Sequence, residues 1–230
     1  GGKVLIPIPA VGRAQEIMMV IDHYMKSGEM VEAPVFTEGM ISEASAIHES
    51  YPEYLARELK QKILETDDNP FDSEYFTNIE HADAREEPMR DDSPCIILAT
   101  SGMLEGGPVL EYFKNIAPDK KNKVLFVSYQ VNGTLGRRVL DGSKQATMLG
   151  KEGKVEIVTI NCGVEKLDGF SGHSDYNQLM SFVQRLRPKL RRVLVNHGER
   201  SKSKNLAMNI GRMYKLPAHF PQVQEAIKLF

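Results

Sequence analysis

Two of the six histidines in this chain lie in glycine-containing turns, where an imidazole can reach a ligand or a substrate. His173 belongs to the segment GFSGHSD (169–175), and His197 belongs to VLVNHGE (193–199), at the end of a short apolar run. An imidazole ionises near neutral pH, so it can transfer a proton or bind a metal. The other histidines are read as surface or hydrogen-bonded residues: His23, His48, His81 and His219. We therefore expect His173 and His197 to share one active-site edge, although either residue alone could be structural.

A complete zinc site is not expected from these residues. A catalytic zinc takes about three protein ligands, and a site with two metals needs more. The chain has no HxH or HExxH motif and no cysteine pair at ligand spacing. Asp175 is expected to cap the helix that begins near Tyr176, so it is not counted as a ligand. If the two histidines serve a metal, most of its ligands lie outside this chain.

The elements that must position these turns alternate between strand and helix. Strands are expected at 3–10, 33–39, 95–100, 123–130 and 154–161, and helices after Gly12 and at 51–65, 106–117 and 134–140. The pattern predicts an α/β fold with a doubly wound, mostly parallel sheet, and ligands gather at the carboxyl ends of such strands. Polar stretches at 66–74 and 81–94 are read as loops. One face of each of the first two helices is expected to point inward: Ala14, Ile17, Met18, Ile21, Tyr24 and Met25 in one, and Tyr54, Leu55, Leu59 and Ile63 in the other.

The pattern changes near residue 163, which predicts two domains at 1–163 and 164–230. The second has an expected helix at 176–187, a strand at 191–197, a helix at about 202–214 and a strand-like ending. With roughly 65 residues, it would be marginally stable by itself.

Composition is that of an ordinary globular protein: 230 residues, 41% hydrophobic, 26% charged and a net charge of −2. No apolar run approaches the ~18–20 residues of a membrane span, so no membrane partner is expected. The start has no initiator Met and no signal-peptide pattern, and we read it as a cut within a longer protein. Cys95 and Cys162 are expected to be buried thiols in a reducing cytoplasm. The runs RLRPKLRR (185–192) and KKNK (120–123) are either basic patches or solvated loops.

Five segments of the chain resemble the β-CASP branch of the metallo-β-lactamase superfamily, and most of all the archaeal homologues of the cleavage and polyadenylation specificity factor nuclease. They are GGKVLIPIPAVGRAQE, ILATSGMLEGGPVLEYF, VSYQVNGTLGRRVLDG, GFSGHSD and VLVNHGE, in this order. The resemblance implies that 1–163 is a β-CASP domain. It implies that 164–230 is the C-terminal portion of a metallo-β-lactamase αββα sandwich, whose partner layer would come from an N-terminal segment absent here.

The resemblance also implies residue roles in a zinc-dependent RNA endonuclease of the mRNA 3′-end-processing or transcription-termination type. His173 would protonate the leaving oxygen, and His197 would be one ligand of the two zinc ions in an intact active site. Single-stranded RNA would be bound by Thr100, Ser101, Gly102, Thr134, Arg137 and Ser171. The family's HxHxDH motif and the acid that orients the leaving-group histidine are missing, so the chain alone is expected to be inactive. A homodimer is implied as well, although the tail PQVQEAIKLF departs from the family pattern.

Three alternatives stay open. First, the residues named as RNA contacts could be structural. TSGM (100–103) could be a tight turn, and Thr134 and Arg137 could serve helix capping and solvation. The whole protein could be a noncatalytic RNA-binding or scaffolding subunit of the same fold. A nucleotide-dependent enzyme with a doubly wound sheet also fits the pattern, but the chain has neither GxGxxG after the first strand nor GxxxxGK[ST].

Overall fold

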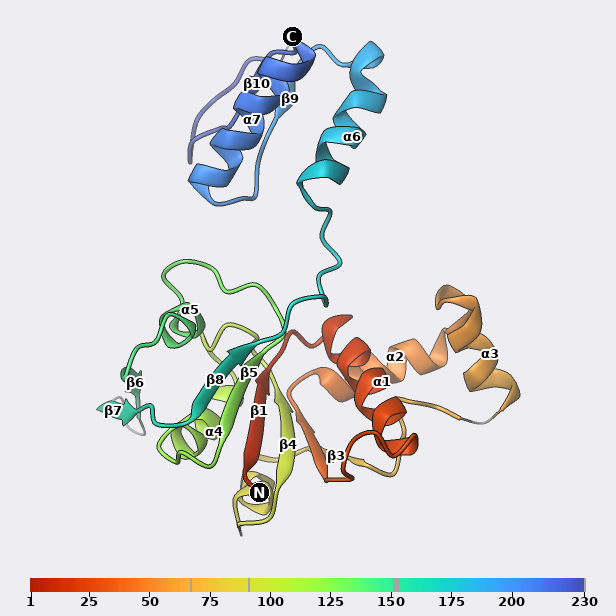
Figure 1. Ribbon diagram of the computed structural model, residues 1–230, viewed down its shortest axis with the longest axis vertical. Helices are drawn as coiled ribbons and strands as arrows, with labels where there is room; N and C mark the ends of the chain where they lie inside the picture. The colour runs from red at the N-terminus through yellow and green to blue at the C-terminus, as the bar shows by residue number, and fades with distance from the viewer. Residues whose placement is uncertain (67, 91, 151–153, 230) are drawn as a thin grey trace. The chain divides into compact units, whose positions relative to one another are not determined.

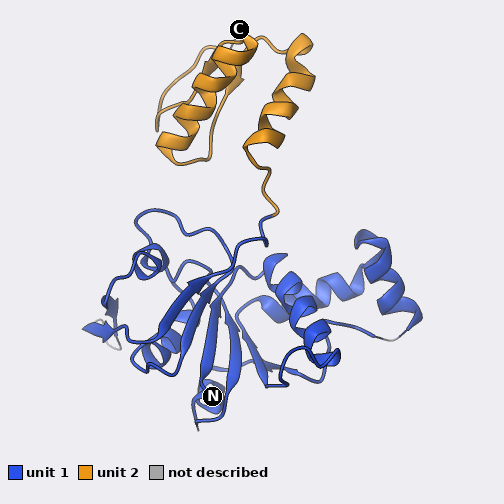
Figure 2. Ribbon diagram, in the orientation of Figure 1, with its two compact units in different colours: residues 1–171 blue, residues 172–230 orange. Residues whose placement is uncertain are grey.

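The computed structural model describes residues 1–66, 68–90, 92–150 and 154–229 (Figure 1). The chain divides into two compact units, which are residues 1–171 (unit 1) and 172–230 (unit 2) (Figure 2). None of the helices in the described ranges combines the length and the apolar character that crossing a bilayer requires.

Unit 1 is built on one sheet of parallel strands. The strands are β1 (Lys3–Pro7), β2 (Val35–Glu38), β3 (Phe76–Ile79), β4 (Cys95–Ala99), β5 (Lys123–Phe126) and β8 (Gly163–Lys166). Their order is β3-β2-β4-β1-β5-β8, and each neighbouring pair is parallel. The predicted α/β fold with a mostly parallel sheet is confirmed, and all carboxyl ends lie at one edge of the sheet (Figure 1).

Helices cover both faces of this sheet, as in a doubly wound fold. On one face, α1 (Arg13–Lys26) and α2 (Ile41–Ser50) pack on a cluster that includes Ile6, Ile17, Ile41 and Leu98. On the other face, α4 (Val109–Ile116) and α5 (Leu135–Leu140) pack on a cluster that includes Leu5, Ile97, Phe113 and Phe126. Successive strand residues point to opposite faces, so all five residues of β4 are buried.

The segment from 41 to 65 differs from its prediction. It forms α2, a short 3₁₀ turn at Pro52–Tyr54 and α3 (Arg57–Glu65), where the pattern predicted one helix over 51–65. The residue before a proline avoids helical geometry, which ends α2 at Ser50 ahead of Pro52. Tyr54 is 84% exposed and Tyr24 is 43% exposed, so the prediction that they point inward is wrong.

The region of the polar stretches contains structure that its composition did not indicate. The stretch at 81–94, expected to be a loop, contains the 3₁₀ helix η2 (Ala82–Met89), and the edge strand β3 lies between the two polar stretches, where no strand was predicted. An edge strand has only one neighbour, so it can carry exposed polar residues such as Thr77 and Asn78. The strand expected at 154–161 is β7 (Val155–Thr159), but it pairs antiparallel with β6 (Gln145–Leu149) in a separate two-stranded sheet.

The end of the first sheet lies after the domain boundary expected at 163/164. β8 begins at Gly163 and pairs with β5 through Lys166, so the sheet of unit 1 takes its last strand from the residues expected to start the second domain. The compact units divide between Ser171 and Gly172.

Unit 2 has a small core. It contains α6 (Tyr176–Leu186), the 3₁₀ turn η4 (Arg187–Lys189), β9 (Val193–Leu194), α7 (Arg200–Tyr214) and β10 (Ala218–His219). Its buried apolar side chains are Met180, Val183, Ala207 and Ile210. Phe182 and Met208 are more than 60% exposed, so much apolar surface of unit 2 is left uncovered.

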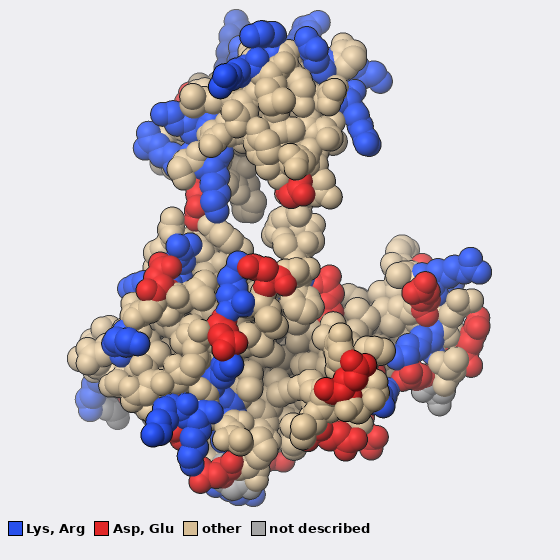
Figure 3. All heavy atoms as spheres, in the orientation of Figure 1, with Lys and Arg blue, Asp and Glu red and all other residues tan. Residues whose placement is uncertain are grey.

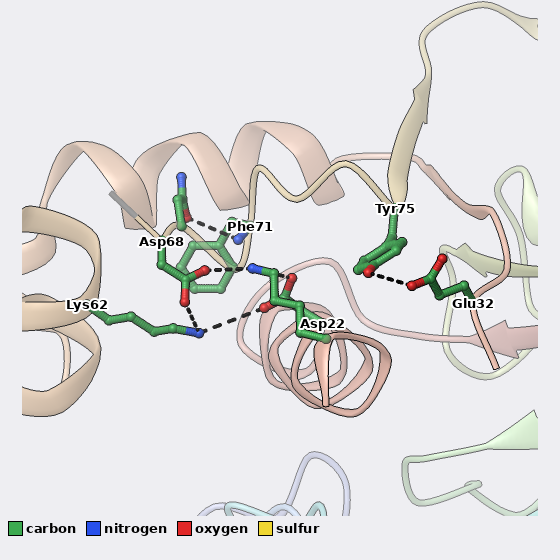
Figure 4. Close-up of polar contacts among 8 residues, drawn as sticks. Asp22, Glu32, Lys62, Asp68, Phe71 and Tyr75 are labelled. Atoms are coloured by element: carbon green, nitrogen blue, oxygen red, sulfur yellow. Dashed lines mark hydrogen bonds and ion pairs between the residues drawn. The ribbon is translucent and has the colours of Figure 1, made fainter. Parts of the chain in front are cut away.

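An ionic cluster, here called the α3 tether, joins α3 to α1 in unit 1 (Figure 4). Asp22 of α1 is fully buried, and its Oδ1 lies 2.9 Å from Lys26 Nζ. Lys26 also reaches Asp68 at 2.6 Å, and Lys62 of α3 lies 2.9 Å from Asp68 and 3.8 Å from Asp22. Hydrogen bonds from Lys26 and Lys62 lower the pKa of Asp68 below its ordinary value.

Candidate functional site

The loop between β4 and α4, residues 100–108, lies at the carboxyl end of the central strands. Ser101 N donates to Gly106 O (3.1 Å), and Val109 N donates to Thr100 O (3.0 Å), so the loop is closed by its own backbone. Ser101 Oγ accepts from Glu105 N (3.3 Å), which leaves the hydroxyl proton available to another acceptor. Ser101 is half-buried and held in one place, as a contact to a phosphate would require.

Glycines let neighbouring segments approach this loop closely. A Cβ at Gly102 would lie 2.8 Å from Pro9 Cδ, which follows β1. A Cβ at Gly39, which follows β2 with φ +92°, would overlap Thr100 Oγ1. The turns after β1, β2 and β4 therefore meet at the carboxyl edge, and Gly102 is required there for space rather than for an unusual backbone angle.

The side chain of Gln130 is hydrogen-bonded to the loop at 100–108, and sequence reasoning did not single it out. It is 2% exposed, and its Nε2 donates to Gly102 O (2.9 Å) and Ser128 O (3.2 Å). Its Oε1 has no hydrogen-bond partner among the described residues and faces Gly136, where a Cβ would overlap it. The one sequence signal for this role is that an amide side chain ends the strand-like segment KVLFVSYQ (123–130).

The same loop binds the start of α5, so the structure brings TSGM and GTLGRR together. Gly136 N donates to Met103 O (2.9 Å), and Leu135 N donates to Glu105 Oε1 (2.5 Å). Glu105 lies between glycine-rich turns and was also missed.

The polar atoms of Thr134 and Arg137 have structural partners within or beside α5. Thr134 Oγ1 accepts from Arg137 N (3.2 Å) and donates to Val131 O (2.8 Å), so Thr134 caps the helix. Arg137 Nε lies 2.8 Å from Asp141 Oδ2, an i,i+4 ion pair. These contacts agree with helix capping for Thr134, and they give the Arg137 side chain a partner within its own helix.

A buried ionic network stands at the end of β2, beside the loop. Glu38 is 5% exposed, and its Oε1 accepts from Arg85 Nε (2.7 Å) of η2. Its Oε2 accepts from Tyr112 OH (2.6 Å) of α4, and its own carbonyl accepts from Thr100 N (3.4 Å). Burial and the hydrogen bond to Glu38 raise the pKa of Tyr112, and the same carboxylate raises the pKa of Arg85. The network therefore fixes the end of β2, to which the backbone N–H of Thr100 is hydrogen-bonded.

In unit 2, His173 lies three residues before α6 and is exposed. The predicted cap by Asp175 is confirmed, because Gln178 N donates to Asp175 Oδ1 (2.8 Å) and Gln178 Oε1 accepts from Asp175 N (2.8 Å). This reciprocal capping box fixes the start of the helix just after the histidine. Ser171, another predicted RNA contact, is exposed and is the last residue of unit 1.

His197 lies three residues before α7 and is also exposed. Its φ of +61° is left-handed, a geometry in which His is more common than most residues other than glycine. A Cβ at the next residue, Gly198, would lie 2.7 Å from Ser203 Oγ, so the turn passes close to the first turn of α7. The backbone therefore makes a sharp turn at His197.

The two histidine turns lie at the same end of unit 2. β9 and β10 are parallel and joined through α7, so α7 runs opposite to both strands. α6 and α7 contact each other, and Figure 1 shows that both helices begin at the same end of the unit. Three residues of chain span at most about 10 Å, so each imidazole is near the start of its helix. We call this region the histidine end.

The described residues do not form a zinc site by themselves. No three His, Cys, Asp or Glu side chains among them converge in a way that could hold a metal. His197 offers one exposed imidazole, whereas a catalytic zinc takes about three protein ligands. The nearby Asp175 is used as a helix cap, and His219 Nε2 lies 2.8 Å from Glu225 Oε1.

The loop and the histidine end lie in the segments that match known protein families. A model of the Beta-Casp domain matches residues 14–139, and a model described as a Zn-dependent metallo-hydrolase RNA specificity domain matches residues 157–221. A protein named transcription termination factor FttA from Cenarchaeum symbiosum is 81% identical over 230 residues, which are 100% of this chain and 36% of that protein.

Proteins of the same name occur in more distant archaea. Those from Pyrococcus abyssi and Methanocaldococcus jannaschii are 47% and 46% identical over 229 residues, 100% of this chain and 35% and 36% of those proteins. The chain thus spans little more than a third of the length of these relatives. Since the Beta-Casp model alone matches more than half of the 230 residues, the chain belongs to the β-CASP family of metallo-β-lactamase-fold proteins.

Proposed function

We propose that this chain acts within a longer zinc-dependent RNA endonuclease of the transcription-termination or mRNA 3′-end-processing type. Within it, 1–163 would be the β-CASP domain, and 164–230 would be the returning part of the metallo-β-lactamase sandwich. The names of the archaeal relatives and the match to an RNA specificity domain support this assignment. The uncovered apolar surface of unit 2, including Phe182 and Met208, fits a layer that packs against further protein.

The observation that carries the proposal is the placement of His173 and His197 at one end of unit 2, each three residues ahead of a helix. His173 would donate a proton to the leaving oxygen of the RNA, a role that imidazole performs near neutral pH. His197 would be one zinc ligand, with the others outside this chain. Zinc, when bound to the complete set of ligands, would supply a hydroxide and neutralise phosphate charge.

The loop at 100–108 would hold the RNA backbone. The hydroxyl of Ser101 has its acceptor role satisfied within the loop, so its proton can go to a phosphate oxygen. Thr100 and Gly102 set the position of that hydroxyl through their packing against Gly39 and Pro9. Thr134, Arg137 and Ser171 would be secondary contacts, since capping and ion pairing already engage the first two.

The reaction is tested with a version of the protein extended at its N-terminus to the length of the relatives. His173→Gln should lower the rate of RNA cleavage by about 100-fold or more, the usual size of a general-acid contribution, while RNA affinity is kept. His81→Gln is the matched control, because His81 is exposed and lies ahead of η2 in unit 1.

Two results would reject the assignment of His173. Equal losses in both histidine variants would show that the effect is not local, and unchanged cleavage in His173→Gln would remove the acid role. If the extended protein binds RNA but never cleaves it, the noncatalytic RNA-binding or scaffolding subunit is the correct reading.

We also propose a cytoplasmic location and a homodimer. Cys95 and Cys162 are both buried thiols, and burial raises the pKa of the Cys162 thiol, which fits a reducing compartment. Sedimentation equilibrium of the extended protein tests the dimer, which would give twice the mass of one chain.

A further inference from the structure

Charge is distributed very unevenly between the two units (Figure 3). Residues 172–230 contain 11 Lys and Arg against 3 Asp and Glu, a formal charge of +8. Residues 1–171 contain 18 Lys and Arg against 28 Asp and Glu, a formal charge of −10, which together give the net charge of −2. A small unit with this excess of cations attracts polyanions, while unit 1 repels them outside its local binding loop.

Five of these cations are concentrated at one place, here called the basic end, which spans the last turn of α6, η4 and the approach to β9. All five are exposed: Arg185, Arg187, Lys189, Arg191 and Arg192. None of them forms an ion pair with a carboxylate of the described residues, and Arg192 Nη1 donates to the carbonyl of Lys228 (3.1 Å). Exposed guanidinium groups without acidic partners are suited to phosphate oxygens.

The basic end and the histidine end lie at opposite ends of α6. His173 precedes the first residue of this helix, and the cations begin in its last turn. An 11-residue helix is about 16 Å long. A stacked strand advances by about 3.4 Å per nucleotide along its axis, so a stacked strand that runs along α6 would span roughly five nucleotides.

We propose that the basic end of unit 2 binds the backbone of RNA roughly five nucleotides away from the histidine end, as a second contact separate from the loop at 100–108. The identity of the polyanion as RNA rests on the proposed function. The contact would be independent of sequence, because Arg and Lys side chains bind phosphates without reading bases. This second contact would lengthen the segment of RNA that the protein binds and would orient that segment along α6.

The test measures binding of a 24-nucleotide oligouridylate, labelled at its 5′ end, to the full 230-residue chain by fluorescence anisotropy at several salt concentrations. The variant Arg187→Gln/Lys189→Gln/Arg191→Gln removes three charges and spares Arg192, which holds the tail. The control Lys120→Gln/Lys121→Gln/Lys144→Gln removes three exposed charges from unit 1. A third variant, Arg187→Lys/Arg191→Lys, keeps the charge of the basic end. Thermal melting shows whether each variant is folded.

We expect about tenfold weaker binding at 0.1 M salt for the variant without the three charges, and a salt slope smaller by about 2. The unit 1 control and the charge-keeping variant should each bind within about twofold of the wild type. Equal losses in the two neutralised variants, or no loss in either, would overturn the proposal.

If the wild-type chain does not bind the 24-mer, the proposal is overturned too. The basic end would then be a binding site for an acidic protein surface instead of RNA. These outcomes do not depend on RNA cleavage or on zinc. A failure of the endonuclease assignment would instead appear in the extended protein, so the two failures are distinguishable.

Discussion

At the scale of single residues, Glu38 is the side chain on which the carboxyl edge of unit 1 depends most. It is buried at the end of β2 and satisfied on both oxygens, by Arg85 and Tyr112. A buried carboxylate that loses a hydrogen-bond donor keeps its desolvation cost. Removing either partner should therefore cost more than removing an ordinary surface contact.

The first prediction concerns Tyr112→Phe, which removes one hydroxyl. We expect a loss of about 1.5–3 kcal/mol in the free energy of unfolding, the usual value for a hydrogen bond to a charged group. Urea unfolding at pH 7 measures it. Tyr54→Phe is the control, because Tyr54 is 84% exposed, and it should change stability by less than about 0.5 kcal/mol. Equal effects of the two substitutions would contradict the role of the network.

The same hydroxyl predicts a dependence on pH. Tyr112 has its pKa raised above the ordinary 10.0, first by burial and then by Glu38. An unfolded tyrosine ionises above pH 10 whereas the folded one does not, so the stabilisation is complete below pH 10 and declines above it. The stability difference between wild type and Tyr112→Phe should shrink by up to about 1.4 kcal/mol per pH unit above pH 10. A difference that stays constant to pH 11 would contradict this linkage.

Residue types predicted some of these roles and not others. Asp175 was recognisable as a cap because a capping residue and its helix are adjacent in sequence. Glu38, Arg85 and Tyr112 come from three separate elements, and their meeting depends on the sheet order. No local pattern marks such a network. Gln130 was missed for the same reason, since its partner Gly102 is 28 residues away.

At the scale of elements, the loop at 100–108 offers a matched pair of glycines. The second prediction is that Gly102→Ala lowers RNA affinity about tenfold, because the new methyl group would lie 2.8 Å from Pro9 Cδ and displace Ser101. Gly106→Ala should bind RNA within about twofold of the wild type, since no atom lies within 4 Å of its added Cβ. Anisotropy with a labelled oligonucleotide compares them, and equal affinities would remove the loop from the RNA site.

The α3 tether gives the third prediction. Asp22→Asn leaves Lys26 and Lys62 without their buried carboxylate, so α3 should open more readily. Amide hydrogen exchange in α3 should be about tenfold faster, equivalent to about 1.4 kcal/mol. Glu58→Gln, an exposed change in the same helix, should leave exchange unaltered. Exchange rates in α3 that match the wild type in both variants would show that the tether does not hold the helix.

The tether also has a predicted acid sensitivity. Asp68 has its pKa lowered by Lys26 and Lys62, so its stabilising effect is present above the ordinary value of 3.8 and is lost as the pH falls through the lower folded value. The exchange measurement repeated toward acid pH should therefore show α3 loosening once Asp68 is protonated.

Elements with a long periodic or continuous apolar pattern were predicted well. Short elements and elements rich in polar residues were not. α1 and β4 have strong periodic or continuous apolar patterns and were found at their expected places. The short strands β3 and β6 were missed, because an edge strand and an outlying hairpin need few apolar residues. The break at Pro52 was visible in the sequence, but a proline is also tolerated in a helix's first turn, so both readings fit the pattern.

At the scale of the whole molecule, the proposed contacts with RNA are divided between the two units. Unit 1 carries a charge of −10 and offers one shaped loop, whereas unit 2 carries +8 and offers exposed cations. The long-range electrostatic attraction to RNA should come from unit 2. The loop of unit 1 should fix the position of the bound RNA backbone. The chain's overall charge of −2 conceals this division, which becomes visible only when the boundary between the units is known.

The chain covers only part of the length of its relatives, and this bears on where the zinc ligands lie. It spans 36% of the relative from Cenarchaeum symbiosum, and its described residues bring no three potential ligands together. In the proposed function, His197 would therefore need zinc ligands that lie outside the described residues. We therefore predict that the zinc site is divided between this chain and other segments of the longer protein.

Metal analysis of the 230-residue chain, beside the N-terminally extended protein, tests that claim most directly. We predict almost no tightly bound zinc in the 230-residue chain and about two zinc ions in the extended protein, the number a two-metal hydrolase needs. His197→Gln in the extended protein should lower this content and His81→Gln should not. Two zinc ions bound by the 230-residue chain alone, or an extended protein without zinc, would contradict the account.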